Sequence, residues 1–447
     1  MNKLDEAQGQ GNASPMATRA ALSSIAGSAL EWLDFAAYGA IAATVLPKLF
    51  FPAADPTTAT LAAFATFSVG FLARPLGGLV CGYYGDKLGR RKVLVFTFLL
   101  MGLCSFLIGI LPTYASVGIW APVGLVALRF LQGFALGGEV TGSQLLTMEH
   151  APRHRRGFYS SFIAMGSPLA QVLANALLFG IAALMSNEQF DALGWRIPFL
   201  FSFLLVALGL YIRFRVSETP EFTRRKGLPA AADPQGTLAY LPTMMRLVLV
   251  WAAPSMGYFI AAVYSLNYAV TTLGLSKQTA FAILILAHLC SMLAMAAGGL
   301  LADRHGRRRT MLGASLVMLV AMAAFFPLVA SNQALWVGCG VVALLCAVQF
   351  HAGIQPVYFA EAFPPAMRYR GSAVGYNIAN LIGSSAPFVA TWLGAQFSGA
   401  WWPMLCVGLG FNVLSLAAIF FGREAYVPHA QRDPASGLMD VQPGPSR

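Results

Sequence analysis

The stretch Gly82-Tyr-Tyr-Gly-Asp-Lys-Leu-Gly-Arg-Arg-Lys92 decides the fold, because it is a short basic turn between two long apolar runs. The same spacing, Gly-x-x-x-Asp-Lys/Arg-x-Gly-Arg-Arg, returns in Gly299-Leu-Leu-Ala-Asp-Arg-His-Gly-Arg-Arg-Arg309. Asp86 and Asp303 are 217 residues apart (303 − 86), which is about half of the 447-residue chain. The two turns therefore indicate an internal repeat.

A second pair of motifs supports the same period. Glu149-His-Ala-Pro152 precedes Arg155-Arg-Gly157, and Glu361-Ala-Phe-Pro364 precedes Arg368-Tyr-Arg-Gly371. Glu149 and Glu361 are 212 residues apart (361 − 149). Two unrelated motifs with nearly one period indicate that the chain is a duplicated unit.

The composition predicts a protein embedded in lipid. Hydrophobic residues make up 57% of the chain and charged residues 11%, whereas soluble proteins carry about 25% charged residues. The six cysteines lie in apolar runs without a Cys-x-x-Cys motif, which favours packing over metal or redox roles. The basic residues that give the chain its net charge of +11 lie in alternate loops, as the positive-inside rule requires. We therefore expect no nucleic-acid partner.

Apolar runs of about 20 residues recur along the whole chain and predict an all-α integral membrane fold. We expect twelve transmembrane helices in two pseudo-symmetric six-helix halves. Their predicted positions are 21–48, 57–83, 93–114, 118–147, 158–185, 197–216, 243–272, 277–301, 310–330, 333–359, 371–396 and 400–422.

The basic clusters at 87–92, 153–156, 213–226, 304–309 and 368–370 all fall on one side of these spans, which predicts that this side and both termini are cytoplasmic. The opposite loops hold almost nothing basic beyond Lys48 and Lys277. The predicted organisation is an N-terminal tail (1–20), a first half (21–216), a cytoplasmic linker (217–242), a second half (243–423) and a C-terminal tail (424–447).

Five ionisable residues of the first half are predicted at bilayer depth, where a charge normally faces a cavity and a partner. They are Glu31, Asp34, Arg74, Arg129 and Glu139. We expect Asp34 to pair with Arg129, and Arg74 to pair with Glu31 or Glu139. One acid is then left over, and burial favours its neutral form, as a proton carrier requires. Asp34 is the first candidate and Glu31 the second; the alternative is a static buried network.

Uncharged polar residues at helical spacing are candidates for substrate contacts, together with Arg74 and Arg129. Hydrogen bonds between helices are the alternative role for each of them. These candidates are Gln171 and Asn175 in the first half, and Tyr264, Asn267, Tyr268, His351, Gln355, Asn377 and Asn380 in the second.

The repeated basic turn resembles the loop signature of the major facilitator superfamily, which lies between the second and third transmembrane helices of each half. Further stretches, in chain order, are similar to the bacterial metabolite:proton symporter family, most of all to its shikimate- and organic-acid-type members. They are Leu30–Gly39, Gly70–Gly78, Arg129–Glu139, Glu149–Pro152, Trp195–Phe199 and Glu218–Phe222. One departure is Gly137-Gly-Glu-Val-Thr-Gly142, where members of the family are expected to have Gly-Gly-Glu-Trp-Gly-Gly.

The resemblance implies the major facilitator fold and a cytoplasmic gate of charged residues that closes during alternating access. The alternative is that the basic residues only fix the topology. The implied gate residues are Gly82, Asp86, Lys87, Gly89, Arg90, Arg91, Glu149, Arg156, Glu218, Asp303, Arg304, Gly306, Arg307, Glu361 and Arg368.

We therefore expect a monomeric secondary transporter of the bacterial inner membrane that imports a small organic acid with protons and needs no cofactor beyond the proton gradient. The expected acids are dicarboxylates, tricarboxylates or shikimate-like carboxylates. A symporter of betaine or proline and a proton-driven efflux carrier are the alternatives. An enzyme is disfavoured because the sequence shows no nucleophile–base set, metal spacing or phosphate-binding loop. A solute sensor is disfavoured because no signalling domain fits the loops or tails.

Overall fold

The computed structural model describes residues 29, 32–88, 90–137, 155–202, 237–331, 333–364 and 367–422, and within these ranges the regular structure is helical. Residues 32–44 form a helix. The helices that follow are α2 (Leu46–Phe50), α3 (Pro56–Leu88), α4 (Arg90–Ile110), α5 (Tyr114–Val117), α6 (Trp120–Gly137), α8 (Arg156–Ala164), α9 (Gly166–Leu184), α10 (Asn187–Ala192), η2 (Gly194–Arg196), η3 (Thr237–Tyr240), α13 (Leu241–Phe259), η4 (Ile260–Tyr264), α14 (Ser265–Thr271), α15 (Lys277–His305), α16 (Arg307–Ala330), α17 (Ala334–Glu361), α18 (Arg368–Ser384), α19 (Ala386–Gln396) and α20 (Trp402–Phe420).

Nine helical segments in the described ranges are long and apolar enough to cross a membrane. They agree with the predicted spans, although three of those spans are interrupted. Pro168 and Pro387 stand at the breaks between α8 and α9 and between α18 and α19, because proline cannot donate the helical hydrogen bond. The third interruption is η4, a π-helical turn between α13 and α14.

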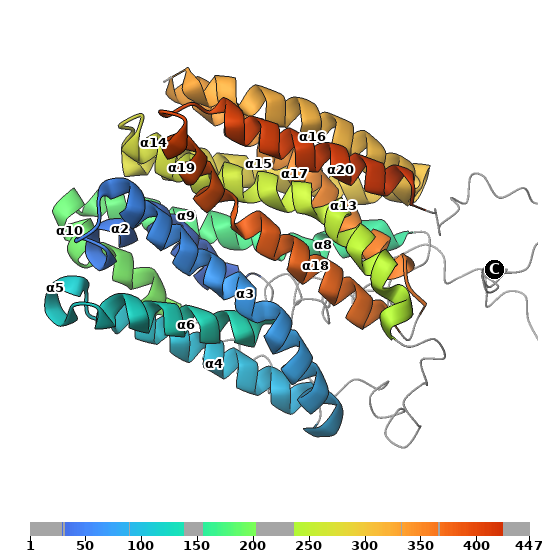
Figure 1. Ribbon diagram of the computed structural model, residues 1–447, viewed down its shortest axis with the longest axis horizontal. Helices are drawn as coiled ribbons and strands as arrows, with labels where there is room; N and C mark the ends of the chain where they lie inside the picture. The colour runs from blue at the N-terminus through green and yellow to red at the C-terminus, as the bar shows by residue number, and fades with distance from the viewer. Residues whose placement is uncertain are drawn as a thin grey trace, which may run out of the picture.

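The helices form two groups, which we call the first half (up to residue 202) and the second half (from residue 237). Figure 1 shows the first half, coloured blue to green, beside the second half, coloured yellow to red. Helices α8 and α9 pack against α15, and α3 packs against α18 and α19. The two halves therefore meet along two interfaces.

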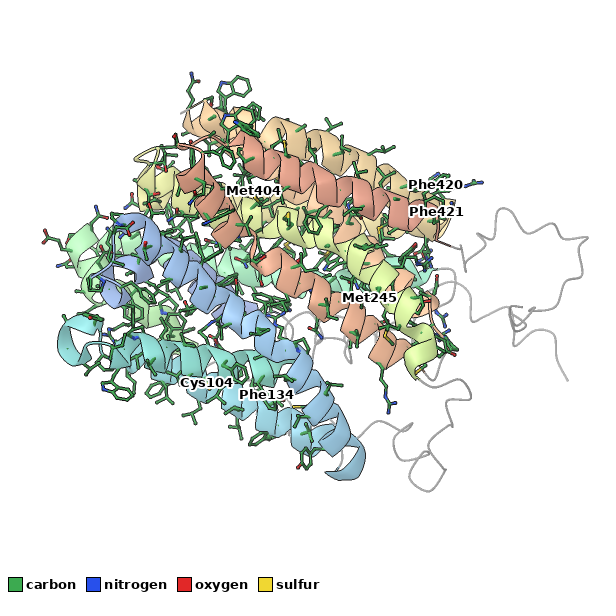
Figure 2. All side chains as sticks on the ribbon, viewed as in Figure 1. Cys104, Phe134, Met245, Met404, Phe420 and Phe421 are labelled. Carbon is green, nitrogen blue, oxygen red and sulfur yellow. The ribbon has the colours of Figure 1, made fainter. Side chains whose placement is uncertain are left out.

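The outer surface of the bundle is apolar. Phe420 and Phe421 are 56% and 80% exposed at the end of α20 (Figure 2), and Leu293 on α15 is 75% exposed. Exposure of so large an apolar area to water is unfavourable, so these side chains are expected to face lipid. The surface therefore agrees with the membrane-spanning fold that the composition predicts.

Glycines bring α3 and α6 into backbone contact. A Cβ atom on Gly77 would lie 1.8 Å from the carbonyl oxygen of Phe134, and one on Gly133 would lie 1.8 Å from that of Gly70. Small residues at such crossings let transmembrane helices approach closely. This approach holds Arg74 on α3 and Arg129 on α6 in one buried region.

Candidate functional site

A chain of buried hydrogen bonds connects Arg129 to Asp34. Arg129 Nη1 donates to Gln132 Oε1 (2.5 Å), and Gln132 Nε2 donates to Ser105 Oγ (2.6 Å). The hydroxyl of Ser105 in turn donates to Asp34 Oδ2. None of the four side chains is more than 3% exposed. We call this set the relay.

The relay differs from the predicted pairing of Asp34 with Arg129. Among the described residues no direct ion pair joins the two groups, although they interact electrostatically. The reason is that Gln132, one helical turn after Arg129, accepts a hydrogen bond from the guanidinium of Arg129 and donates one to Ser105. The sequence analysis missed both bridging residues, and the i, i+3 spacing of Arg129 and Gln132 was the available signal.

Arg74 lies in a cage of aromatic rings. Its guanidinium carbon lies 4.8 Å from the ring centroid of Trp32, 4.6 Å from that of Phe35 and 4.0 Å from that of Phe71. The residue is 1% exposed, and Nε, Nη1 and Nη2 have no hydrogen-bond partner within the described parts of the chain. Glu31 and Glu139, the predicted partners of Arg74, lie outside the described residues.

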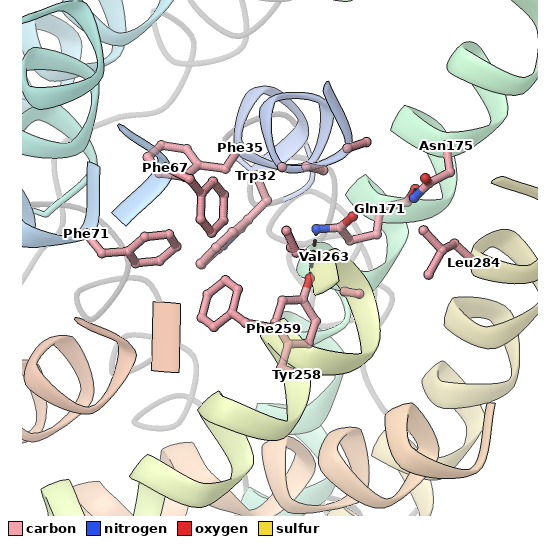
Figure 3. Close-up of a pocket in the computed structure, with 14 residues that line it drawn as sticks. Trp32, Phe35, Phe67, Phe71, Gln171, Asn175, Tyr258, Phe259, Val263 and Leu284 are labelled. Atoms are coloured by element: carbon pink, nitrogen blue, oxygen red, sulfur yellow. Dashed lines mark hydrogen bonds between the residues drawn. The ribbon is translucent and has the colours of Figure 1, made fainter. Parts of the chain in front are cut away.

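A cavity of about 20 Å³ lies between the halves, which is room for about one water molecule. Figure 3 shows Gln171 of α9 donating to the hydroxyl of Tyr258 on α13 across it, at 2.7 Å. Its lining includes the predicted residues Gln171 and Asn175 and several aromatic side chains that the sequence analysis missed. These are Trp32, Phe35, Phe67, Phe71, Tyr258 and Phe259.

The spacing of Phe67, Phe71 and Arg74 (i, i+4, i+7) was the signal for part of this wall, since it places all three on one face of α3. With both halves in contact around it, the cavity is too small for an organic solute. The structure is therefore a closed conformation of the two halves.

The polar face predicted from Tyr264, Asn267 and Tyr268 does not line the cavity. Asn267 Nδ2 donates to the carbonyl oxygen of Ala43 in the first half (2.7 Å), and the rings of Tyr264 and Tyr268 pack together at 6.0 Å. The π-helical turn explains the difference, because its wider turn changes which residues share a face with the cavity wall.

The predicted polar residues of α17 and α18 are buried but also do not line the cavity. His351 Nε2 bonds to Ser315 Oγ at 3.0 Å, and Asn380 Oδ1 accepts from Ser255 Oγ at 2.9 Å. Both bonds join helices of the second half. Gln355 and Asn377 are also buried, at 3% and 6% exposed.

At the end of the bundle that carries the basic turns, which we call the basic end, Asp303 connects the halves. Its two carboxylate oxygens accept from the backbone N–H groups of Gly157 and Phe158, both at 2.9 Å. These amides form the N-terminus of α8, where a negative charge is stabilised. Arg307 Nη1 donates to Asp303 at 2.6 Å, and its Nε lies 3.5 Å from Glu361 Oε2.

The other predicted gate residues are placed as follows. Arg368 Nε donates to the carbonyl oxygen of Phe363 (3.3 Å), Arg304 is exposed, and Gly306 adopts a φ of 92° between α15 and α16. Arg156 begins α8. Only the helical backbone is described at Gly82, Asp86, Lys87, Arg90 and Arg91, and Gly89, Glu149 and Glu218 lie outside the described residues.

The opposite end of the bundle has an ion pair that the sequence analysis missed. Lys277 Nζ, at the start of α15, lies 2.6 Å from Asp191 Oδ1 on α10 and 4.4 Å from the ring centroid of Phe190. Lys48 Nζ lies 3.6 Å from the other oxygen of Asp191. Gln278 Nε2 donates across the interface to the carbonyl oxygen of Ala182 at 2.8 Å. In the sequence, the signal for this ion pair was the presence of the isolated Lys48 and Lys277 on this side of the predicted spans.

Comparison with known sequences identifies the family. The Major Facilitator Superfamily profile matches residues 19–384. The chain belongs to the major facilitator superfamily. Among its members, the shikimate transporter of Escherichia coli (strain K12) is 38% identical over 392 residues, which cover 86% of this chain and 90% of that protein. The proline/betaine transporter of Salmonella typhimurium is 35% identical over 379 residues, or 82% of this chain and 76% of that one.

The fold agrees with this membership. The crystal structure of a D-xylose-proton symporter superposes with a TM-score of 0.72 at 18% sequence identity, covering 91% of this chain and 98% of that one. The predicted major facilitator fold is thus confirmed. The profile match and the related transporters confirm the assignment to the metabolite:proton symporter family within the superfamily. The chain is a multi-pass membrane transporter.

Proposed function

We propose that this transporter is a proton-coupled symporter that imports a small organic acid across the bacterial inner membrane, with its basic end in the cytoplasm. The proposal rests on one observation: the two buried arginines of the first half, Arg74 and Arg129, have different contacts. Arg129 is connected to an acid through its Nη1 and the relay, whereas none of the three nitrogen atoms of the neighbouring Arg74 has a hydrogen-bond partner among the described residues. In this assignment Asp34 takes the proton and Arg74 takes the substrate carboxylate.

The relay gives protonation of Asp34 a structural effect. An ionised Asp34 accepts from Ser105 and balances the charge of Arg129 through Gln132. Once protonated, Asp34 no longer attracts Arg129, and the contacts around both side chains change. A solute can favour one conformation of the halves only if it binds the two conformations differently. Protonation of the relay and binding at Arg74 supply such differences in the same region.

Uptake by the purified protein in proteoliposomes tests the proposal. An inward proton gradient is expected to drive accumulation of labelled shikimate or another organic acid. Asp34→Asn keeps an acceptor for Ser105 but cannot be protonated, so gradient-driven accumulation should fall about tenfold or more while counterflow exchange continues. Asp55→Asn is the matched control, because Asp55 is an exposed acid of the same half. Accumulation that survives in Asp34→Asn would contradict the role of Asp34.

A zwitterionic osmolyte is the second candidate substrate, and the aromatic cage favours it. Trp32, Phe35 and Phe71 line the cavity beside Arg74, and a quaternary ammonium group binds to such rings through cation–π contacts. The same uptake assay with glycine betaine distinguishes the candidates. Betaine accumulation without acid accumulation would replace the organic-acid proposal.

A further inference from the structure

A hydrogen bond across the cavity joins the two halves. Gln171 of α9 donates from Nε2 to the hydroxyl of Tyr258 on α13 at 2.7 Å, and both side chains line the cavity (Figure 3). The cavity of about 20 Å³ leaves no room for an organic solute beside this bond. The bond therefore belongs to a closed conformation in which the halves meet without a solute between them.

The walls around this hydrogen bond are mostly apolar. Trp32, Phe35 and Phe259 lie among the lining side chains. Polar groups such as the amide of Gln171 and the hydroxyl of Tyr258 need hydrogen-bond partners in such surroundings. An oxygen atom of a solute can be the partner of Gln171 when the cavity is wide enough to hold that solute. When the halves close without a solute, the hydroxyl of Tyr258 takes this position.

The second half holds the ring of Tyr258 in place. The ring packs edge-on against Phe259 and His288, with centroid distances of 5.2 and 6.3 Å and interplanar angles of 84° and 79°. His288 is fully buried, and its Nδ1 bonds to the carbonyl oxygen of Leu284 at 2.8 Å. A phenylalanine at position 258 keeps these ring contacts, so Tyr258→Phe removes the hydroxyl alone.

Net uptake and exchange use the closed conformation differently. In alternating access the site faces one side of the membrane at a time, so the carrier closes between its two open conformations. Net uptake requires one closure with solute and one closure without it in every cycle. Exchange of labelled for unlabelled solute requires only closure around bound solute. A contact that forms only without solute therefore affects net uptake and leaves exchange unchanged.

We propose that Tyr258 takes the place of the solute at Gln171 when the empty carrier closes, and that this hydrogen bond sets the rate at which the empty carrier returns. The two residues lie on opposite halves, so the bond breaks when the halves separate around a solute. Its loss makes the empty closed conformation less stable and slows passage through it. The inference rests on the proposed function, because it assumes net uptake of a solute that binds at this cavity.

Uptake of labelled shikimate into proteoliposomes tests the inference with Tyr258→Phe. We expect the initial rate of gradient-driven uptake to fall about tenfold, which corresponds to about 1.4 kcal/mol for one hydrogen bond. Counterflow exchange should match that of the parent. The final accumulation should also match, because the relay is intact, whereas Asp34→Asn is expected to lower it. Tyr240→Phe is the matched control, since Tyr240 packs against Phe363 and does not line the cavity.

Two results of this assay would overturn the inference. An equal fall of net uptake and exchange would show that the hydroxyl of Tyr258 acts while solute is bound, or that the variant is damaged as a whole. Net uptake at the parental rate would show that the return of the empty carrier does not depend on the hydroxyl.

A cysteine at position 262 gives a readout that needs no transported solute. Ala262 lines the cavity and is 6% exposed, so a thiol there reacts when the halves separate. In a background without the six native cysteines, Tyr258→Phe should raise labelling by a thiol reagent about tenfold without solute. Labelling at the parental rate would overturn the inference. Failure of every acid to respond to the proton gradient would instead overturn the proposed function, and the labelling result would still decide the role of Tyr258.

Discussion

The two ends of the molecule hold the halves together with different chemistry. At the basic end, Asp303 accepts from two backbone amides and from Arg307, and Asp303 and Arg307 are only 8% and 2% exposed at their side chains. At the opposite end, the side chain of Lys277 is likewise only 8% exposed, but its partner Asp191 is 24% exposed. A partly hydrated ion pair stabilises the contact between the halves less than a buried network does. We therefore expect the opposite end of the bundle to open more readily than the basic end.

One reporter residue can test both ends. Ala262 lines the cavity and is 6% exposed, so a cysteine at this position becomes reactive when either end opens. The six native cysteines are first replaced, and a membrane-impermeant thiol reagent is applied to vesicles of either orientation. The side from which labelling accelerates shows which end has opened.

The largest effect is expected from Asp303→Asn. The substitution leaves Arg307 buried without the carboxylate and removes the charge at the N-terminus of α8, at a cost of about 3 kcal/mol to the closed basic end. Labelling of the reporter from the basic side should rise about 100-fold. Asp55→Asn, at an exposed site, is the control. Unchanged labelling would show that Asp303 does not hold this end closed.

A smaller effect is expected from Gly299→Ala. The added Cβ would lie 2.6 Å from the carbonyl oxygen of Gly157 and 2.9 Å from the side chain of Ser161, so the halves must separate slightly at a cost of about 1–3 kcal/mol. Labelling from the basic side should increase. Gly313→Ala, where no atom lies within 4 Å of the added Cβ, should label like the parent. Equal rates for the two variants would mean that the close contact is not needed for closure.

The smallest effect is expected from Lys277→Gln. Loss of the ion pair with Asp191 should cost the closed opposite end about 1 kcal/mol, which raises labelling from that side about fivefold. Lys48→Gln is the matched control, because Lys48 is 67% exposed and 3.6 Å from the same acid. The comparison would be wrong if Lys277→Gln opened its end as much as Asp303→Asn opens the other.

The fold could be predicted from the sequence because its signals are local. Long apolar runs define the spans and the basic turns mark one side, so α15 begins at Lys277, where the prediction placed it. Burial of Asp34, Arg74 and Arg129 could also be predicted, since depth follows from counting residues along a helix.

The partners of these residues could not be predicted, because they depend on which helix faces which. Ser105 is far from Asp34 and Gln132 in sequence, and only packing brings it between them. The π-helical turn before Asn267 changed the helical spacing on which the predicted polar face depended, and no sequence pattern announced it. His351 and Asn380 form hydrogen bonds within the second half, and Asn267 bonds to the first half, because buried polar groups are normally satisfied by partners in the folded chain.

The relay contains one carboxyl group, that of Asp34, and this number bears on the energy source of transport. A single proton that moves with a monoanion carries no net charge across the bilayer. The membrane voltage, worth about 2.3 kcal/mol per elementary charge and 100 mV, then contributes nothing to accumulation. The concentration ratio that such a carrier can reach would follow the pH difference alone, by about tenfold for each pH unit.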